Sequence, residues 1–192
     1  YENFVDKDNI VYNKKLASGH TFPTDFDSQG NNLCAASTNP FISNCGFDGA
    51  GAILQHIYPD LAHRTNSPTG EFLKFKQTEF FSSSIGLDDV GYLYVPKACA
   101  DGAKCRLHIA FHGCAQSYSN VGTKFLHNTG YDKWADNNHI IVLFPQTKVD
   151  YTIHLTNLNG LQNNMNACWD WVGYYDSYYD TKDGKQMSTI HA

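Results

Sequence analysis

Three residues that could support catalysis, His112, Gly113 and Cys114, end an alternating apolar stretch at 106–112. Alternation of apolar and polar side chains predicts a β-strand, and a glycine turn after a central strand can point a backbone N–H into an active site. Enzymes that transfer acyl groups stabilise the developing oxyanion with such N–H groups. The tripeptide predicts an oxyanion hole with the N–H of Cys114 as donor; the alternative is that Gly113 merely ends a strand.

A second candidate is His20, which lies between a glycine and the turn at Pro23. A hydrolase needs an imidazole on a loop, where it can pass a proton between the nucleophile and the leaving group. The setting of His20 suits that role. The alternative is an exposed loop histidine without a catalytic function.

Trp169 is the third candidate, in the aromatic segment that follows Cys168. If Cys168 is bonded to Cys114, the indole lies beside the oxyanion loop, where it can exclude water and contact an acyl chain. Without that bond, a buried core position explains Trp169 better.

The sequence has no Gly-x-Ser-x-Gly nucleophile elbow, which an α/β-type serine hydrolase places between a strand and a helix. The nearest stretch is 82–86, where Ser82 occupies the first glycine position, and a loop is the better interpretation. A metal site is not indicated, because there is no His-Glu-x-x-His motif. His108 and His112 would lie about 13 Å apart on a strand that rises ~3.3 Å per residue, too far to share an ion. No glycine-rich nucleotide loop indicates a cofactor.

Strands and helices alternate around these candidates. Strands are expected at 9–15, 72–77, 91–95, 106–112 and 140–144, and helices at 48–58, 123–137 and 184–191. The order strand, helix, strand over 106–144 is a βαβ unit and favours a parallel sheet. A loop is expected from Val149 onward. The 192 residues suit one domain of the α/β class.

The six cysteines predict disulfides and an oxidising compartment. The simplest pairing closes two short loops and leaves one long-range bond: Cys34–Cys45, Cys99–Cys105 and Cys114–Cys168. The net charge of −5, from 14 basic and 19 acidic residues, argues against nucleic acid or an anionic membrane as partner. No apolar stretch approaches the ~20 residues that span a bilayer.

Taken together, these segments resemble the fungal secreted poly(3-hydroxybutyrate) depolymerases, whose α/β-hydrolase fold is circularly permuted. The resemblance covers nearly the whole chain from about Asn9. It rests on several stretches in the same order: 20–26, 44–52, 91–96, 107–114, 128–131, 133–136, 151–154 and 168–173.

The resemblance implies a mostly parallel sheet with flanking helices, and His20 as the triad histidine. It also implies the N–H of Cys114 in the oxyanion hole, Trp169 at the substrate and the three disulfides above. In the family the serine and the aspartate precede the histidine, whereas nineteen residues precede His20 here. Residues 1–192 are therefore expected to form one incomplete catalytic domain that lacks the nucleophile-elbow strand, accompanied by the missing N-terminal segment of the same precursor.

The leading hypothesis is a secreted serine-type carboxylic ester hydrolase that acts on a polyester or on small esters, without a cofactor or metal. A second hypothesis is a non-catalytic secreted binding or defence protein derived from such a hydrolase. A carbohydrate-active protein is a third, and it rests only on the richness in aromatic residues and Asn, because no pair of carboxylates stands out.

Overall fold

The computed structural model describes residues 1–192 and has a mixed four-stranded sheet at its centre. Its strand order is β4 (Glu71–Lys76), β5 (Val90–Val95), β7 (Ile140–Phe144) and β6 (Arg106–Ile109). Only β6 and β7 are parallel, whereas β4 with β5 and β5 with β7 are antiparallel. The expectation of a mostly parallel sheet is therefore wrong for this sheet. The physical reason is that only the predicted βαβ unit has the helical crossover that parallel pairing requires.

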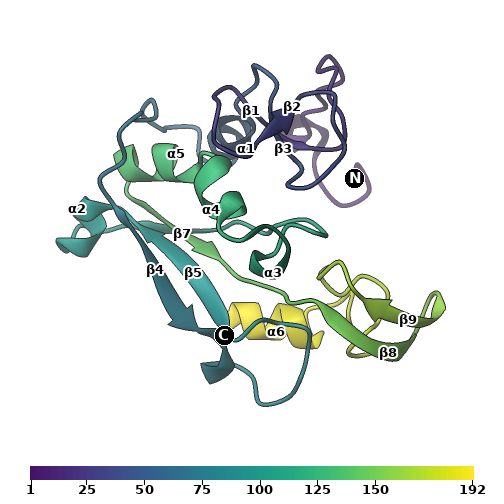
Figure 1. The fold of residues 1–192 in the computed structure, drawn as a ribbon. Helices are drawn as coiled ribbons and strands as arrows, with labels where there is room; N and C mark the ends of the chain where they lie inside the picture. Colours follow the sequence, from purple (N-terminus) through teal and green to yellow (C-terminus); the bar gives the residue numbers. More distant parts are fainter.

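Helices cover one face of this sheet (Figure 1). They are α5 (Tyr131–Asn137), which packs on β7 and β5, and α4 (Lys124–Asn128), whose Phe125 meets the ring of Phe144. The helix α1 (Gly49–Ile57) lies behind them, against α5 and the strand at Phe22–Thr24. The prediction of a helix capped by Asp48 is confirmed, because its carboxylate accepts the N–H of Gly51 at 2.8 Å. The core beneath these helices consists of buried apolar residues from helices and strands: Ala50, Leu54, Tyr92, Tyr94, Ala110, Phe125, Leu126, Tyr131, Trp134, Ala135, Ile140, Val142 and Phe144.

The single helix expected at 123–137 is broken into α4 and α5 at Gly130. This glycine has φ +85°, and a Cβ at its position would lie 2.9 Å from the ring of Phe26. A left-handed residue cannot continue a right-handed helix. The break turns the chain so that both short helices pack on the sheet.

The opposite face of the sheet is covered only at one end, by α6 (Lys185–His191), whose start was predicted. Leu107, Ile109 and Phe111 point to this face, since they alternate with the buried His108, Ala110 and His112. Leu107 is 58% exposed and Phe111 is 52% exposed. The strand β6 is therefore both an edge strand and apolar on its less covered face.

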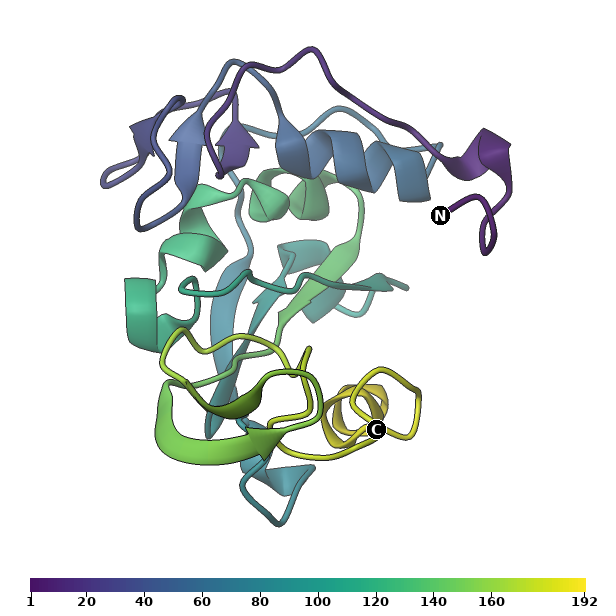
Figure 2. The same ribbon diagram turned by 90° about the vertical axis from the view of Figure 1, so that its right-hand side faces the viewer.

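Two smaller sheets flank this core. One is parallel, in the order β1 (Phe22–Thr24), β3 (Ile42–Asn44) and β2 (Asn32–Leu33). The other is the antiparallel hairpin of β8 (Asp150–Thr156) and β9 (Gly160–Asn164). Figure 2 shows the hairpin and α6 at the end of the molecule opposite to α1 and the parallel sheet. The loop expected after Val149 is thus in part a hairpin.

The remaining elements are short. They are α2 (Lys97–Ala100), α3 (Tyr118–Val121) and the 3-10 helices η1 (Lys7–Asn9) and η2 (Gln77–Glu79). The strand expected at 9–15 is absent, because no other strand pairs with this segment and an unpaired strand leaves its backbone groups to water. None of the helices has the length and apolar content that crossing a membrane requires.

Candidate active site

The loop of His20 is held by close backbone packing. Its neighbour Gly19 donates its N–H to Cys34 O at 2.8 Å, and a Cβ on Gly19 would lie 2.6 Å from Ala36 O. The N–H of His20 donates to Ser37 Oγ at 2.9 Å. The backbone is therefore fixed, while the imidazole is exposed and makes no hydrogen bond within the chain.

The loop after β6 leaves one backbone amide free. The N–H of Gly113 donates to Gln116 Oε1 at 2.9 Å, and the N–H of Ala115 donates to Asn166 O at 2.6 Å. The N–H of Cys114, which lies between them, has no acceptor in the chain. Ala115 adopts φ +59°, an uncommon conformation for a residue with a side chain. This local geometry presents a single unpaired donor at the position that the sequence predicts for an oxyanion hole.

Gln116, which no sequence motif indicates, connects this loop to the loop of His20. Its Nε2 donates to Pro40 O at 3.1 Å and to Phe41 O at 3.0 Å. The ring of Phe41 meets the imidazole of His20 edge-on, with 6.1 Å between the ring centroids. One buried side chain thus bridges two segments about 75 residues apart in sequence. The only signal in the sequence was a residue with both a donor and an acceptor two positions after Cys114.

Trp169 packs against the residues that follow β6. The Cys114–Cys168 disulfide brings the two Cα atoms to 4.3 Å, and the indole N–H donates to His112 O at 2.9 Å. The indole also meets the ring of Phe111 edge-on, with 4.9 Å between centroids. The structure therefore brings Trp169 and Cys114 together.

The loop of Trp169 is organised by the carboxylate of Asp170. It accepts three backbone N–H groups, from Gly173 at 2.7 Å, Tyr174 at 2.8 Å and Tyr175 at 3.0 Å. Charge-assisted bonds of this kind are stronger than neutral ones. The indole is consequently presented by a rigid turn.

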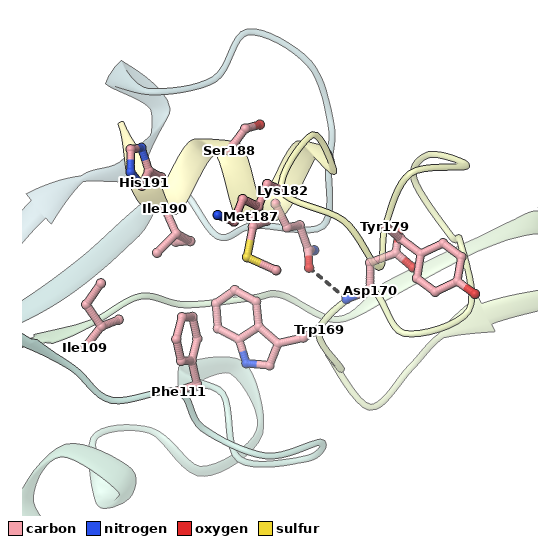
Figure 3. Close-up of a pocket in the computed structure, with 11 residues that line it drawn as sticks. Ile109, Phe111, Trp169, Asp170, Tyr179, Lys182, Met187, Ser188, Ile190 and His191 are labelled. Carbon is pink, nitrogen blue, oxygen red and sulfur yellow. Dashed lines mark hydrogen bonds between the residues drawn. The ribbon is translucent and has the colours of Figure 1, made fainter. Parts of the chain in front are cut away.

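A cavity of about 670 Å³ lies beside the indole. Figure 3 shows Ile109, Phe111 and Trp169 on one wall and Met187 and Ile190 of α6 opposite them. Neither His20 nor Cys114 lines this cavity. The cavity therefore adjoins the candidate site on the side of β6 and does not join its three predicted residues.

His112 is a neutral structural group rather than a proton carrier. Its side chain is 2% exposed, and desolvation by burial lowers the pKa of its imidazole to about 4. Its Nδ1–H donates to Gly113 O at 2.8 Å, and its Nε2 accepts the N–H of Thr147 at 3.3 Å. The hydrogen bonds fix this one tautomer of His112.

Three disulfides are present, Cys34–Cys45, Cys99–Cys105 and Cys114–Cys168, which are the pairings expected above. The stretch 82–84 is exposed loop. No serine hydroxyl and no carboxylate is hydrogen-bonded to the imidazole of His20. No group of three or more His, Cys, Asp or Glu side chains is placed to hold a metal ion.

Comparison with curated proteins identifies two relatives. A polyhydroxybutyrate depolymerase from Talaromyces funiculosus is 50% identical over 190 residues, which are 98% of this chain and 56% of that protein. A poly(3-hydroxybutyrate) depolymerase from Delftia acidovorans is 41% identical over 196 residues, which are 100% of this chain and 36% of that protein. The chain thus spans about half or less of these relatives. No family model matches it.

Two solved structures similar to this chain are also PHB depolymerases. The crystal structure of a PHB depolymerase from Penicillium funiculosum superposes with a TM-score of 0.93 at 49% identity, over 98% of this chain and 60% of that one. A PHB depolymerase complexed with an R3HB trimer gives a TM-score of 0.86 at 51% identity, over 90% of this chain and 55% of that one.

Proposed function

Because the chain is a homologue of the polyhydroxybutyrate depolymerases over nearly its whole length, we propose that it is part of a serine-type ester hydrolase that cleaves a polyester or small hydroxyacid esters. In this proposal His20 acts first as general base and then as general acid. The N–H of Cys114 stabilises the tetrahedral oxyanion, and Trp169 positions the acyl chain.

The observation that carries this proposal is the amide of Cys114. Cys114 is exposed, and the amides on either side of it are both paired within the chain, so its N–H alone among the three is left open to a ligand. The free amide also belongs to a loop that Gln116 ties to the loop of His20. A donor kept free in this way is suited to a charge that exists only in the transition state.

We propose that the serine and the aspartate of the triad come from a further segment of the same precursor. That segment would supply a strand beside β6 and complete a circularly permuted α/β-hydrolase domain. Support comes from the apolar, open edge of β6 and from the cavity of about 670 Å³ next to it. A second cavity of about 480 Å³ lies on the same face of the sheet, lined by Leu107, Leu143 and Phe75 among others.

The substrate class is supported by the outer face of the β8–β9 hairpin. Four apolar side chains are exposed there, each by 67% or more: Tyr151, Ile153, Leu155 and Leu161. Leu155 and Leu161 are directly paired across the two strands, so they lie on the same face. An apolar patch of this kind suits adsorption to a hydrophobic polyester. The three disulfides suit a secreted enzyme.

Hydrolysis of p-nitrophenyl butyrate by the precursor that contains the proposed segment tests this function. We expect turnover that a serine-directed phosphonate blocks, and a loss of kcat on the order of 10³-fold or more in His20→Ala. His63→Ala is the matched control, since His63 is also exposed but lies in another loop. Absence of turnover by a correctly folded precursor, or equal losses in both variants, would contradict the proposal.

Mass spectrometry of the protein isolated from its source tests the companion segment separately. We expect a species heavier than the 21.5 kDa of this chain, or a second peptide that remains associated with it. A single, monomeric and well-folded species at 21.5 kDa would overturn this part of the proposal.

A non-catalytic secreted binding protein is the second candidate. It is favoured by the imidazole of His20, which has neither a serine nor a carboxylate partner in the chain. Binding of a short 3-hydroxybutyrate oligomer without its hydrolysis by the folded precursor would support this candidate.

A further inference from the structure

We propose that Gln116 is a positioning residue that aims the amide of Cys114 and holds it in register with the loop of His20. This inference rests on the proposed function and adds to it a residue that sets the geometry of the reaction. Gln116 is 7% exposed, and each polar atom of its side chain has a partner.

The peptide plane between Gly113 and Cys114 is fixed by hydrogen bonds to its carbonyl. In a trans peptide the C=O and the N–H are coplanar and point in opposite directions. The carbonyl of Gly113 accepts the backbone N–H of Gln116 at 3.1 Å and the Nδ1–H of His112 at 2.8 Å. Because the carbonyl is held by two donors, the direction of the Cys114 N–H is set before any substrate is bound.

Gln116 closes a ring with Gly113 that strengthens this constraint. Its side-chain Oε1 accepts the N–H of Gly113 at 2.9 Å, so one residue binds both backbone groups of Gly113. A Cβ at position 113 would lie 2.8 Å from that same Oε1. Glycine is therefore required there for the side chain of Gln116 to approach.

The other end of the Gln116 side-chain amide contacts the segment that packs on His20. The two bonds from Nε2 reach the carbonyls of Pro40 and Phe41, and Phe41 packs on the imidazole of His20. Phe41 O also accepts the N–H of Phe22 in β1 at 2.7 Å, which anchors this segment to the parallel sheet. The planar side-chain amide of Gln116 thus holds the two loops in a fixed position relative to each other.

Gln77 provides a matched control, because it makes the same set of bonds elsewhere. Its Oε1 accepts the N–H of Gln146 at 2.8 Å, and its Nε2 donates to Asp88 O at 2.6 Å and to Gln146 O at 2.9 Å. It is 3% exposed. Substitutions at Gln77 and Gln116 are therefore expected to cost similar stability. Gln116 is hydrogen-bonded to the loops of Cys114 and His20, whereas Gln77 lines the second cavity and is hydrogen-bonded to neither loop.

The test compares Gln116→Leu with Gln77→Leu in the precursor that carries the nucleophile. We expect Gln116→Leu to lower kcat and the rate of phosphonylation on the order of 10- to 100-fold, with KM changed less than about twofold. Gln77→Leu is expected to keep kcat per folded molecule within about twofold. Equal effects at both sites, or a change in KM alone, would overturn the inference.

Gln116→Glu separates the two ends of the amide. The carboxyl keeps an acceptor for the N–H of Gly113, but it can donate to Pro40 or Phe41 only while protonated. Burial favours the protonated form, so kcat of this variant is expected to fall as the pH rises through the pKa of the new carboxyl. This limb should be absent from wild type and from Gln77→Glu. A profile of Gln116→Glu that matches wild type would contradict the proposal.

A measurement without turnover distinguishes failure of this inference from failure of the proposed function. In Gln116→Leu we expect faster hydrogen exchange of the Gly113 amide and loss of the nuclear Overhauser contact between Phe41 and His20. If wild type shows no hydrolysis, the proposed function fails, while these two signals still decide the positioning role. Unchanged exchange and contact would overturn it.

Discussion

The two edges of the central sheet differ in how they meet solvent. At the β4 edge the charged residues Glu71, Lys74 and Lys76 are exposed, and Leu73 is 43% exposed. On β6 the only charged residue is Arg106. Leu107 is 58% exposed, and Phe111, just after the strand, is 52% exposed. Charged side chains are a common way to protect a natural edge strand from pairing with another chain. The β4 strand is thus suited to remain an edge, whereas β6 is suited to be covered.

Substitution of one leucine on each edge is the strongest test of this difference. In the precursor that contains the proposed segment, Leu107→Lys is expected to lower the free energy of unfolding by about 3 kcal/mol, because the charge would be buried without a partner. Leu73→Lys should cost less than about 1 kcal/mol. Urea denaturation of both variants measures these values.

The isolated 192-residue chain is the control for that experiment. Leu107 is exposed in it, so Leu107→Lys should change its stability by less than about 0.5 kcal/mol. If Leu107→Lys lowers the stability of the chain and of the precursor by similar amounts, then nothing covers β6 and the two edges do not differ in function.

A second test concerns the stability of the protein at acidic pH, which depends on the buried His112 just after β6. The pKa of this histidine is lowered from 6.5 to about 4, so the unfolded chain binds a proton before the folded one does. The contribution to stability is complete above pH 6.5 and is lost as the pH falls towards 4, in total about 3 kcal/mol. Chemical denaturation at a series of pH values should show this loss in wild type and not in His112→Asn.

The loss has to be measured as the difference between wild type and His112→Asn, because the buried Asp132 changes stability in the opposite direction over the same pH range. Burial raises the pKa of its carboxyl from 3.8 to about 6, so its contribution to stability grows as the pH falls through this range. If the two pH profiles are parallel, the neutral tautomer assigned to His112 is wrong.

Asp132 itself gives a third, smaller prediction, on the covered face of the sheet. It is 7% exposed, and its Oδ1 has no hydrogen-bond partner. Asp132→Asn removes a buried charge and is expected to raise the free energy of unfolding by about 1 to 2 kcal/mol at pH 7. At pH 4 the gain should vanish. Asp136→Asn is the control, since Asp136 accepts bonds from Tyr94 and Gly70 and should lose stability on substitution.

The smallest expected effect on stability is in the hairpin. Like β6, its outer face is apolar and exposed, but we relate this face to the polyester and not to another strand. Leu155→Asp should change stability by less than about 0.5 kcal/mol, while adsorption to a poly(3-hydroxybutyrate) film decreases and hydrolysis of a soluble ester stays constant. Thr152→Asp is the matched control on the same strand. If adsorption is unchanged, the apolar face has another role.

The sequence predicted the elements that local pattern determines. The bounds of β7 agree with the apolar run at 140–144, and the cap at Asp48 gave the start of α1. The hairpin was missed although 150–156 alternates and the short loop 157–159 is followed by Gly160, whose φ of +72° fits a three-residue hairpin loop. That error came from the interpretation of the pattern and not from its absence.

Other features depend on contacts between segments far apart and could not be derived locally. The antiparallel pairing of β5 with β7 joins strands that about 50 residues separate in sequence, a separation that does not fix their direction. The role of Gln116 depends on Pro40 and Phe41, about 75 positions earlier. The sequence singled out His20 and Cys114 as candidates, but not the side-chain amide of Gln116 that connects their loops.

The Cys114–Cys168 bond closes a covalent ring across 54 positions, and the β8–β9 hairpin lies inside this ring. If the hairpin adsorbs to a solid polyester, as we propose, it comes under tension when the protein detaches. Both ends of the ring meet at the disulfide, so this tension is carried there by a covalent bond rather than by packing alone. The disulfide therefore keeps the indole of Trp169 and the amide of Cys114 adjacent when the hairpin is pulled.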